Sequence, residues 1–174
     1  MQTELRKHQH TLITYGTGTI LFGLWSLVKS VVYLVFDRSE ESLSYMIEQL
    51  APSEERGIMF VLAISLVSSV FLVDMIFRWA AGRSAQKIGT GKKTIKLGFM
   101  ITSLYIAAVD GFEFVSGIQN IIAGEFMQLD KLLTLLVDIT SFIIVLQMIY
   151  AAFMVGKLSK AIELEGAAAA GSGK

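Results

Sequence analysis

The chain has 174 residues, of which 53% are hydrophobic and 17% are charged, and its fifteen basic side chains balance fifteen acidic ones. Soluble domains carry about 25% charged residues, and disordered chains hold far less apolar surface, so this composition excludes a disordered chain and argues against a soluble globule. The absence of Cys excludes disulfides, thiolate metal sites and cysteine nucleophiles.

Four long apolar blocks dominate the chain. They cover residues 12–36, 57–81, 97–123 and 132–155. A helix needs about 20 apolar residues to cross the hydrocarbon core of a bilayer, and each block exceeds that length. The sequence therefore predicts an all-α, polytopic membrane protein whose four transmembrane helices form two antiparallel hairpins. We expect one transmembrane domain over residues 1–165, followed by a low-complexity tail over residues 166–174.

The polar N-terminus carries Arg6 and Lys7 ahead of the first block. That block is longer than the apolar region of a signal peptide, which has about 7–15 residues, and it lacks a small-residue cleavage pattern, so we expect an uncleaved first span. His8 and His10 could hold a metal weakly as a His-x-His pair. A solvated flank is the simpler interpretation, and we predict no metal site and no cofactor.

The connection between the first two spans, residues 37–56, predicts a short amphipathic helix. Asp37 can cap its start, with Glu40 three residues on as the reciprocal partner. Apolar side chains then follow at helical spacing, at Leu43, Met46, Ile47 and Leu50. We expect this helix to lie on the outer membrane surface or to cap the bundle. A docking face for an external partner is the alternative.

The middle connection, residues 82–96, is basic and holds no acid. Besides Arg83 it contains Lys87, Lys92, Lys93 and Lys96. Its Gly-Thr-Gly-Lys-Lys-Thr segment lacks the spacing of a Walker phosphate loop, which needs four residues between its glycines. We instead predict that the four lysines contact anionic lipid headgroups, each contributing about 1 kcal/mol near the surface. No feature of the chain favours nucleic acid as a partner.

Charge segregates between the two predicted sides of the membrane. The two termini and residues 82–96 together carry ten bases and three acids, whereas the other connections carry three bases and eight acids. Lys and Arg accumulate in the cytoplasmic connections of membrane proteins. We therefore expect a multi-pass protein of the cell membrane with both termini in the cytoplasm.

Six ionisable side chains fall inside the predicted spans. They are Lys29, Asp74, Arg78, Asp110, Glu113 and Asp138. Charge near the middle of a bilayer costs about 2.5–3.5 kcal/mol on insertion scales, so such groups should face other helices and be paired. We expect Lys29 to pair with Glu113 or Asp138, and Asp74 to pair with Arg78, one helical turn further on.

The third span predicts one continuous polar and small face. Its members recur every three or four residues, at Ser103, Ala107, Asp110, Glu113, Gly117, Asn120 and Gly124. Four acids face only two bases in the spans, so at least two acids need a proton, water or a cation. Asp74, Asp110, Glu113 and Asp138 are therefore candidate ion or proton sites. The alternative is that Lys29 and Arg78 form ion pairs that simply lock the bundle.

Two function classes follow from these charges. The first, favoured by the surplus of acids, is an oligomeric permease or channel-like protein. The second is a non-catalytic accessory or scaffold subunit of a larger membrane complex. Asp110-Gly111 resembles the start of the signature of phospholipid-synthesising alcohol phosphotransferases, but Phe112-Glu113-Phe114 replaces the Ala-Arg pair and the spaced acids of that family. We therefore predict that the protein is not an enzyme.

Overall fold

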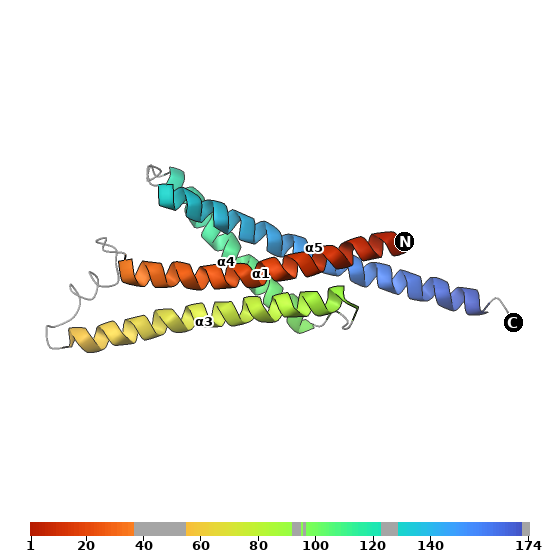
Figure 1. The fold of residues 1–174 in the computed structure, drawn as a ribbon, viewed down its shortest axis with the longest axis horizontal. Helices are drawn as coiled ribbons and strands as arrows, with labels where there is room; N and C mark the ends of the chain where they lie inside the picture. The colour runs from red at the N-terminus through yellow and green to blue at the C-terminus, as the bar shows by residue number, and fades with distance from the viewer. Residues whose placement is uncertain (37–54, 92–94, 96, 123–128, 172–174) are drawn as a thin grey trace. The chain divides into compact units, whose positions relative to one another are not determined.

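The computed structural model describes residues 1–36, 55–91, 95, 97–122 and 129–171. Over these residues the secondary structure consists of four α-helices, α1 (Gln2–Phe36), α3 (Arg56–Gly89), α4 (Leu97–Ile122) and α5 (Leu129–Gly171) (Figure 1). Each helix contains a stretch that is long and apolar enough to cross a membrane. The predicted all-α class with four such helices is confirmed. The predicted external helix lies outside the described residues, and the two-hairpin arrangement of the whole chain stays a prediction.

Three helices extend well past the apolar blocks. α1 begins at Gln2, α3 continues to Gly89, and α5 continues to Gly171. Residues 82–89 and 166–171 are therefore helical, although they lie outside the apolar blocks. The length of an apolar block measures membrane thickness, whereas a helix ends only where its backbone bonding stops. The only Pro of the chain, Pro52, lies outside these extensions.

A left-handed glycine ends α3. Gly91 has a φ of +71°, and its backbone N–H donates to the Ile88 carbonyl oxygen at 2.9 Å. The N–H of Thr90 donates to the Gln86 carbonyl oxygen, also at 2.9 Å. These bonds satisfy carbonyl groups at the helix end, and glycine adopts the required φ without steric penalty.

The chain divides into two compact units, residues 1–21 with 77–174 and residues 22–76. The first unit holds a buried apolar core: Leu12, Ala81, Ala85, Ile88, Phe99, Ile106, Ala107, Val145, Met148, Ala151, Ala152 and Val155. The second unit consists of the later part of α1 and the earlier part of α3. Large apolar side chains on its α3 part are exposed, among them Ile58, Leu62 and Leu66. Such side chains suit contact with lipid.

In the first unit α4 and α5 pack against each other. Gly111 faces the ring of Phe142, and Gly117 faces Leu135, so residues later in α4 meet residues earlier in α5. The rings of Phe114 and Phe142 stack with centroids 6.1 Å apart. The two helices are therefore antiparallel.

The first half of α1 and the end of α3 cross closely in the same unit. A Cβ atom added at Gly16 would lie 2.8 Å from the Gly82 carbonyl oxygen and 2.9 Å from the Ala85 Cβ. One added at Gly89 would lie 2.7 Å from the Gln9 carbonyl oxygen. Small residues thus bring the two backbones together, as they commonly do between membrane helices. The amide of Gln86 donates to the Thr17 hydroxyl at 3.0 Å and closes the same contact.

Candidate functional site

In the described part of the first unit, the buried charges Arg78 and Asp110 form a cluster with the hydroxyl of Ser141. These residues come from α3, α4 and α5, respectively. Their exposed fractions are 4%, 1% and 6%. Since the three residues lie on three helices that are far apart in the sequence, only the tertiary fold creates this site.

Helical spacing places each member of the cluster on the inward face of its helix. On α4 the buried positions include Phe99, Ser103, Ile106 and Asp110. On α5 they include Ser141, Val145, Met148 and Ala152. Both series advance by four, three and four residues, which keeps the side chains on one face. Asp110 is the last residue of the buried series on α4, and Ser141 is the first residue of the buried series on α5.

The cluster is closed by direct hydrogen bonds. The guanidinium of Arg78 forms a salt bridge in which Nη2 donates to Asp110 Oδ1. Its Nη1 lies 3.4 Å from Asp110 Oδ2 and donates to the Ser141 hydroxyl at 2.9 Å. The Ser141 hydroxyl in turn donates to Asp110 Oδ2 at 2.7 Å. Both carboxylate oxygens of Asp110 therefore accept hydrogen bonds.

This arrangement compensates the charge of Asp110 within the protein. A planar guanidinium matches a carboxylate with two parallel N–H donors, which makes such pairs stronger than hydrogen bonds between neutral groups. Removing one partner of a buried ion pair is strongly destabilising, because the other charge is left uncompensated. The cluster can thus hold α3, α4 and α5 together without any bound ion.

Two further buried hydroxyl groups lie on the same core. The Thr19 hydroxyl donates to the Tyr15 carbonyl oxygen at 3.0 Å and lies 3.6 Å from the Met148 sulfur. Ser103 is fully buried, and its Oγ has no hydrogen-bond partner among the residues that the structure describes. Ser103 stands seven residues before Asp110, two turns away on the same face of α4.

The structure gives Arg78 a partner on another helix, where the sequence pointed to Asp74 on its own helix. Asp74 is itself buried, at 8% exposed, and belongs to the other compact unit. Its pairing with Arg78 stays a prediction. Asp110 and Glu113 do not lie together in the core, because Glu113 is exposed while Asp110 is 1% exposed. A step of three residues leaves Glu113 about 60° around α4 from Asp110, at the exposed margin of the buried face.

The remaining predicted residues are distributed as follows. Asp138 is half-buried, and Lys87 is exposed on the extension of α3. The side chain of Lys29 lies outside the described part of the structure, so its predicted pairing with Glu113 or Asp138 stays a prediction. Lys92, Lys93 and Lys96 also lie outside the described residues.

Ser141 is a member of the cluster that the charged residues of the sequence do not reveal; its helical spacing from Thr134 and Asp138 is the signal that could have found it. Arg78 lies near the end of the 57–81 block and Asp110 at the centre of the 97–123 block, so the blocks alone do not bring the two residues to one level. α3 extends eight residues past its block, so the block centre does not give its register against α4.

No group of three or more His, Cys, Asp or Glu side chains that could hold a metal ion occurs among the described residues. No family model, curated protein or solved structure matches this chain.

Proposed function

We propose that this protein is a multi-pass protein of the cell membrane that serves as a non-catalytic accessory or scaffold subunit of a larger membrane assembly. The observation that carries the proposal is the pairing of Asp110 with Arg78 and Ser141. A proton or cation site needs a carboxylate that can exchange its partner for an ion. The most deeply buried acid of the described residues, Asp110, is instead held by two protein side chains.

The proposed topology places the termini and the basic end of α3 in the cytoplasm, because most Lys and Arg side chains outside the apolar blocks gather there. A membrane subunit of this kind contributes its surface to partners. Large exposed apolar side chains such as Leu104, Phe112 and Phe153 offer contacts to lipid or to a second membrane helix. A homo-oligomer and a complex with other subunits are both compatible with that surface.

The second candidate is a proton-coupled permease, and one observation favours it. The buried hydroxyl of Ser103 lacks a hydrogen-bond partner on the polar face that leads to Asp110. A buried polar group without a partner calls for an explanation, such as a water or ion that visits it. In this mechanism a proton on Asp110 would release Arg78 and open the cluster.

Flux measurements on the purified protein in sealed proteoliposomes separate the two candidates. The accessory proposal expects no protein-dependent flux of protons, alkali cations or small solutes in response to an imposed gradient. Liposomes without protein supply the background, and a known ionophore shows that the vesicles are tight. A protein-dependent flux that disappears in a folded Arg78→Met/Asp110→Asn double variant would overturn the accessory proposal and establish the permease.

A further inference from the structure

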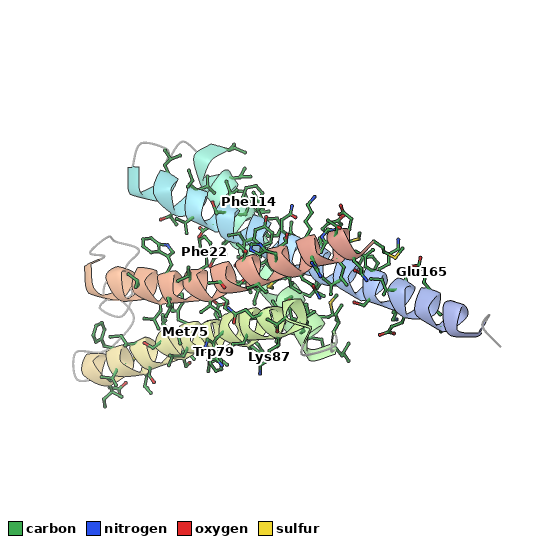
Figure 2. The ribbon with its side chains drawn as sticks, turned by 45° about the vertical axis from the view of Figure 1, so that its right-hand side comes forward. Phe22, Met75, Trp79, Lys87, Phe114 and Glu165 are labelled. Carbon is green, nitrogen blue, oxygen red and sulfur yellow. The ribbon has the colours of Figure 1, made fainter. Side chains whose placement is uncertain are left out.

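The exposed face of the α3 extension carries an aromatic side chain followed by two bases. Trp79, Arg83 and Lys87 are spaced four residues apart and are all exposed. Figure 2 shows Trp79 and Lys87 on the same side of α3. Four residues of helix rise about 6 Å, so the two charges lie about 6 Å and 12 Å beyond the indole along the helix axis. We call these three residues the basic stripe.

The order of side chains along the basic stripe matches the profile of a membrane boundary. The α3 residues before Trp79 are predominantly apolar, and the chain becomes basic immediately after it. Trp79 directly follows Arg78, which bonds Asp110 near the middle of α4, so the indole lies at the level of the hydrocarbon. Arg83 and Lys87 lie one and two turns nearer the membrane surface, and their long side chains can extend to the lipid phosphates.

The guanidinium of Arg83 is already positioned by Trp79. Its Cζ atom lies 4.7 Å from the centroid of the indole ring. This cation–π contact restricts a side chain that would otherwise sweep a large volume. A guanidinium offers several N–H donors in one plane and can bind a phosphate with two of them. Lys87, one turn further, adds a second positive charge on the same side.

The helix that carries the basic stripe is fixed on a neighbouring face, about 90° around the helix from the stripe. Gly82 and Gly89 face α1, where a Cβ atom at either position would overlap α1 atoms. The hydrogen bond from Gln86 to Thr17 joins the same two helices. The stripe is therefore presented by a packed helix and not by a loop, so little ordering is needed when a ligand binds.

We infer that the basic stripe of Trp79, Arg83 and Lys87 binds the phosphate headgroup of an anionic phospholipid at the membrane surface. The occupant is a lipid and not a soluble anion, because Arg83 and Lys87 directly follow the apolar part of α3, at the membrane surface where lipid phosphates are concentrated. This inference does not depend on whether the protein is a scaffold or a permease. The lysines of residues 82–96 would attract anionic lipid in a general way, whereas the basic stripe is a defined site on one face of α3.

Tryptophan fluorescence in mixed bilayers tests this site. Trp79 becomes the only Trp of the full chain in a Trp25→Phe background, because the chain holds two. The protein is placed in phosphatidylcholine bilayers that contain a minor fraction of phosphatidylglycerol, and the acyl chains of one lipid or the other are brominated. Bromine quenches only indoles that it contacts. The site predicts that brominated phosphatidylglycerol quenches Trp79 more than its bulk fraction explains, with an enrichment of about five-fold or more.

Charge variants show whether the stripe is responsible. Arg83→Gln/Lys87→Gln should lower the enrichment by about five-fold or more. Lys157→Gln/Lys160→Gln is the matched control, because it removes the same charge from exposed positions on the extension of α5 and should leave the enrichment unchanged. Equal quenching by the two lipids in the parent protein, or an equal loss in the control variant, would overturn the inference.

Two measurements on the parent protein keep the test decisive if the double variant does not fold. Raising the salt concentration to the molar range should reduce the enrichment, because phosphate contacts of exposed bases are screened. Enrichment that persists in molar salt would contradict the site. Inorganic phosphate at millimolar concentration and constant ionic strength should not displace the lipid. Displacement would assign the stripe to free phosphate and overturn the lipid proposal.

Discussion

The buried carboxylate of Asp110 is compensated by a salt bridge with Arg78. The carboxylate is 1% exposed, yet both of its oxygens accept hydrogen bonds from Arg78 or Ser141. A buried ion pair does not always add stability over apolar side chains of similar size, but losing one member is strongly destabilising. The residue-scale consequence is that changing either charge alone removes a salt bridge from the buried core.

A double-mutant cycle tests this dependence. Arg78→Met removes the guanidinium that bonds the buried Asp110 carboxylate, and Asp110→Asn removes the charged carboxylate that Arg78 bonds. Each single variant should lose about 3–5 kcal/mol of stability, measured by thermal or denaturant unfolding in detergent. Arg78→Met/Asp110→Asn removes both charges together and should be more stable than the sum of the two losses predicts.

The control for the cycle pairs Asp110→Asn with a change outside the cluster. Thr102→Ala is suitable, because the Thr102 hydroxyl bonds only carbonyl oxygens of its own helix, those of Gly98 and Phe99. Residues without shared partners should show additive effects. Strict additivity between Arg78→Met and Asp110→Asn would mean that their salt bridge contributes nothing to the fold.

At the scale of elements, the crossing of α1 and α3 depends on missing side chains. A Cβ atom at Gly82 would overlap the Gly16 carbonyl oxygen and would lie 2.6 Å from Ile20 Cγ1. A backbone oxygen cannot move aside as the end of a flexible side chain can. The same crossing fixes the helix that carries the basic stripe, so its geometry affects both the core and the proposed lipid site.

Gly82→Ala should therefore destabilise the protein by about 1–3 kcal/mol, because overpacking forces backbone shifts. The matched control is Gly98→Ala on α4, since a Cβ atom at Gly98 meets nothing within 4 Å. Alanine is the better helix former by up to about 1 kcal/mol, so the control should be neutral or stabilising. Unfolding in detergent measures both. Equal stabilities for the two variants would show that the helices do not cross as closely as described.

At the scale of the whole molecule, the segregation of charge predicts how the chain is oriented. The basic segments comprise both termini and the connection after α3, and they alternate with acidic connections along the chain. Such a consistent alternation favours one orientation in the membrane. The chain contains no Cys, so single cysteines can report orientation without a background.

We expect a cysteine at Ser44 to be labelled by a membrane-impermeant thiol reagent in intact cells. A cysteine at Ser84, on the extension of α3, should be labelled only after the membrane is permeabilised. Both variants should react equally once the protein is solubilised and denatured, which controls for expression. The reverse pattern in intact cells would contradict the proposed cytoplasmic location of the termini.

The sequence by itself determined the class of the molecule. Four apolar blocks predicted four long helices, because covering a bilayer with satisfied backbone groups requires about 20 apolar residues each time. Helical periodicity also placed Asp110 on the polar face of the third span. Periodicity is a local property, so it can be read from neighbouring residues without knowledge of the fold.

Only the tertiary structure decided which charges meet. Arg78 pairs with Asp110, 32 residues away, and shares Ser141, 63 residues away. Such pairing depends on the register between helices, which is set by side-chain packing such as the Gly16–Gly82 contact and not by the length of the apolar blocks. The apolar blocks do not predict where the helices end, for a related reason. Segments beyond an apolar block, such as residues 82–89, stay helical where packing against another helix stabilises them.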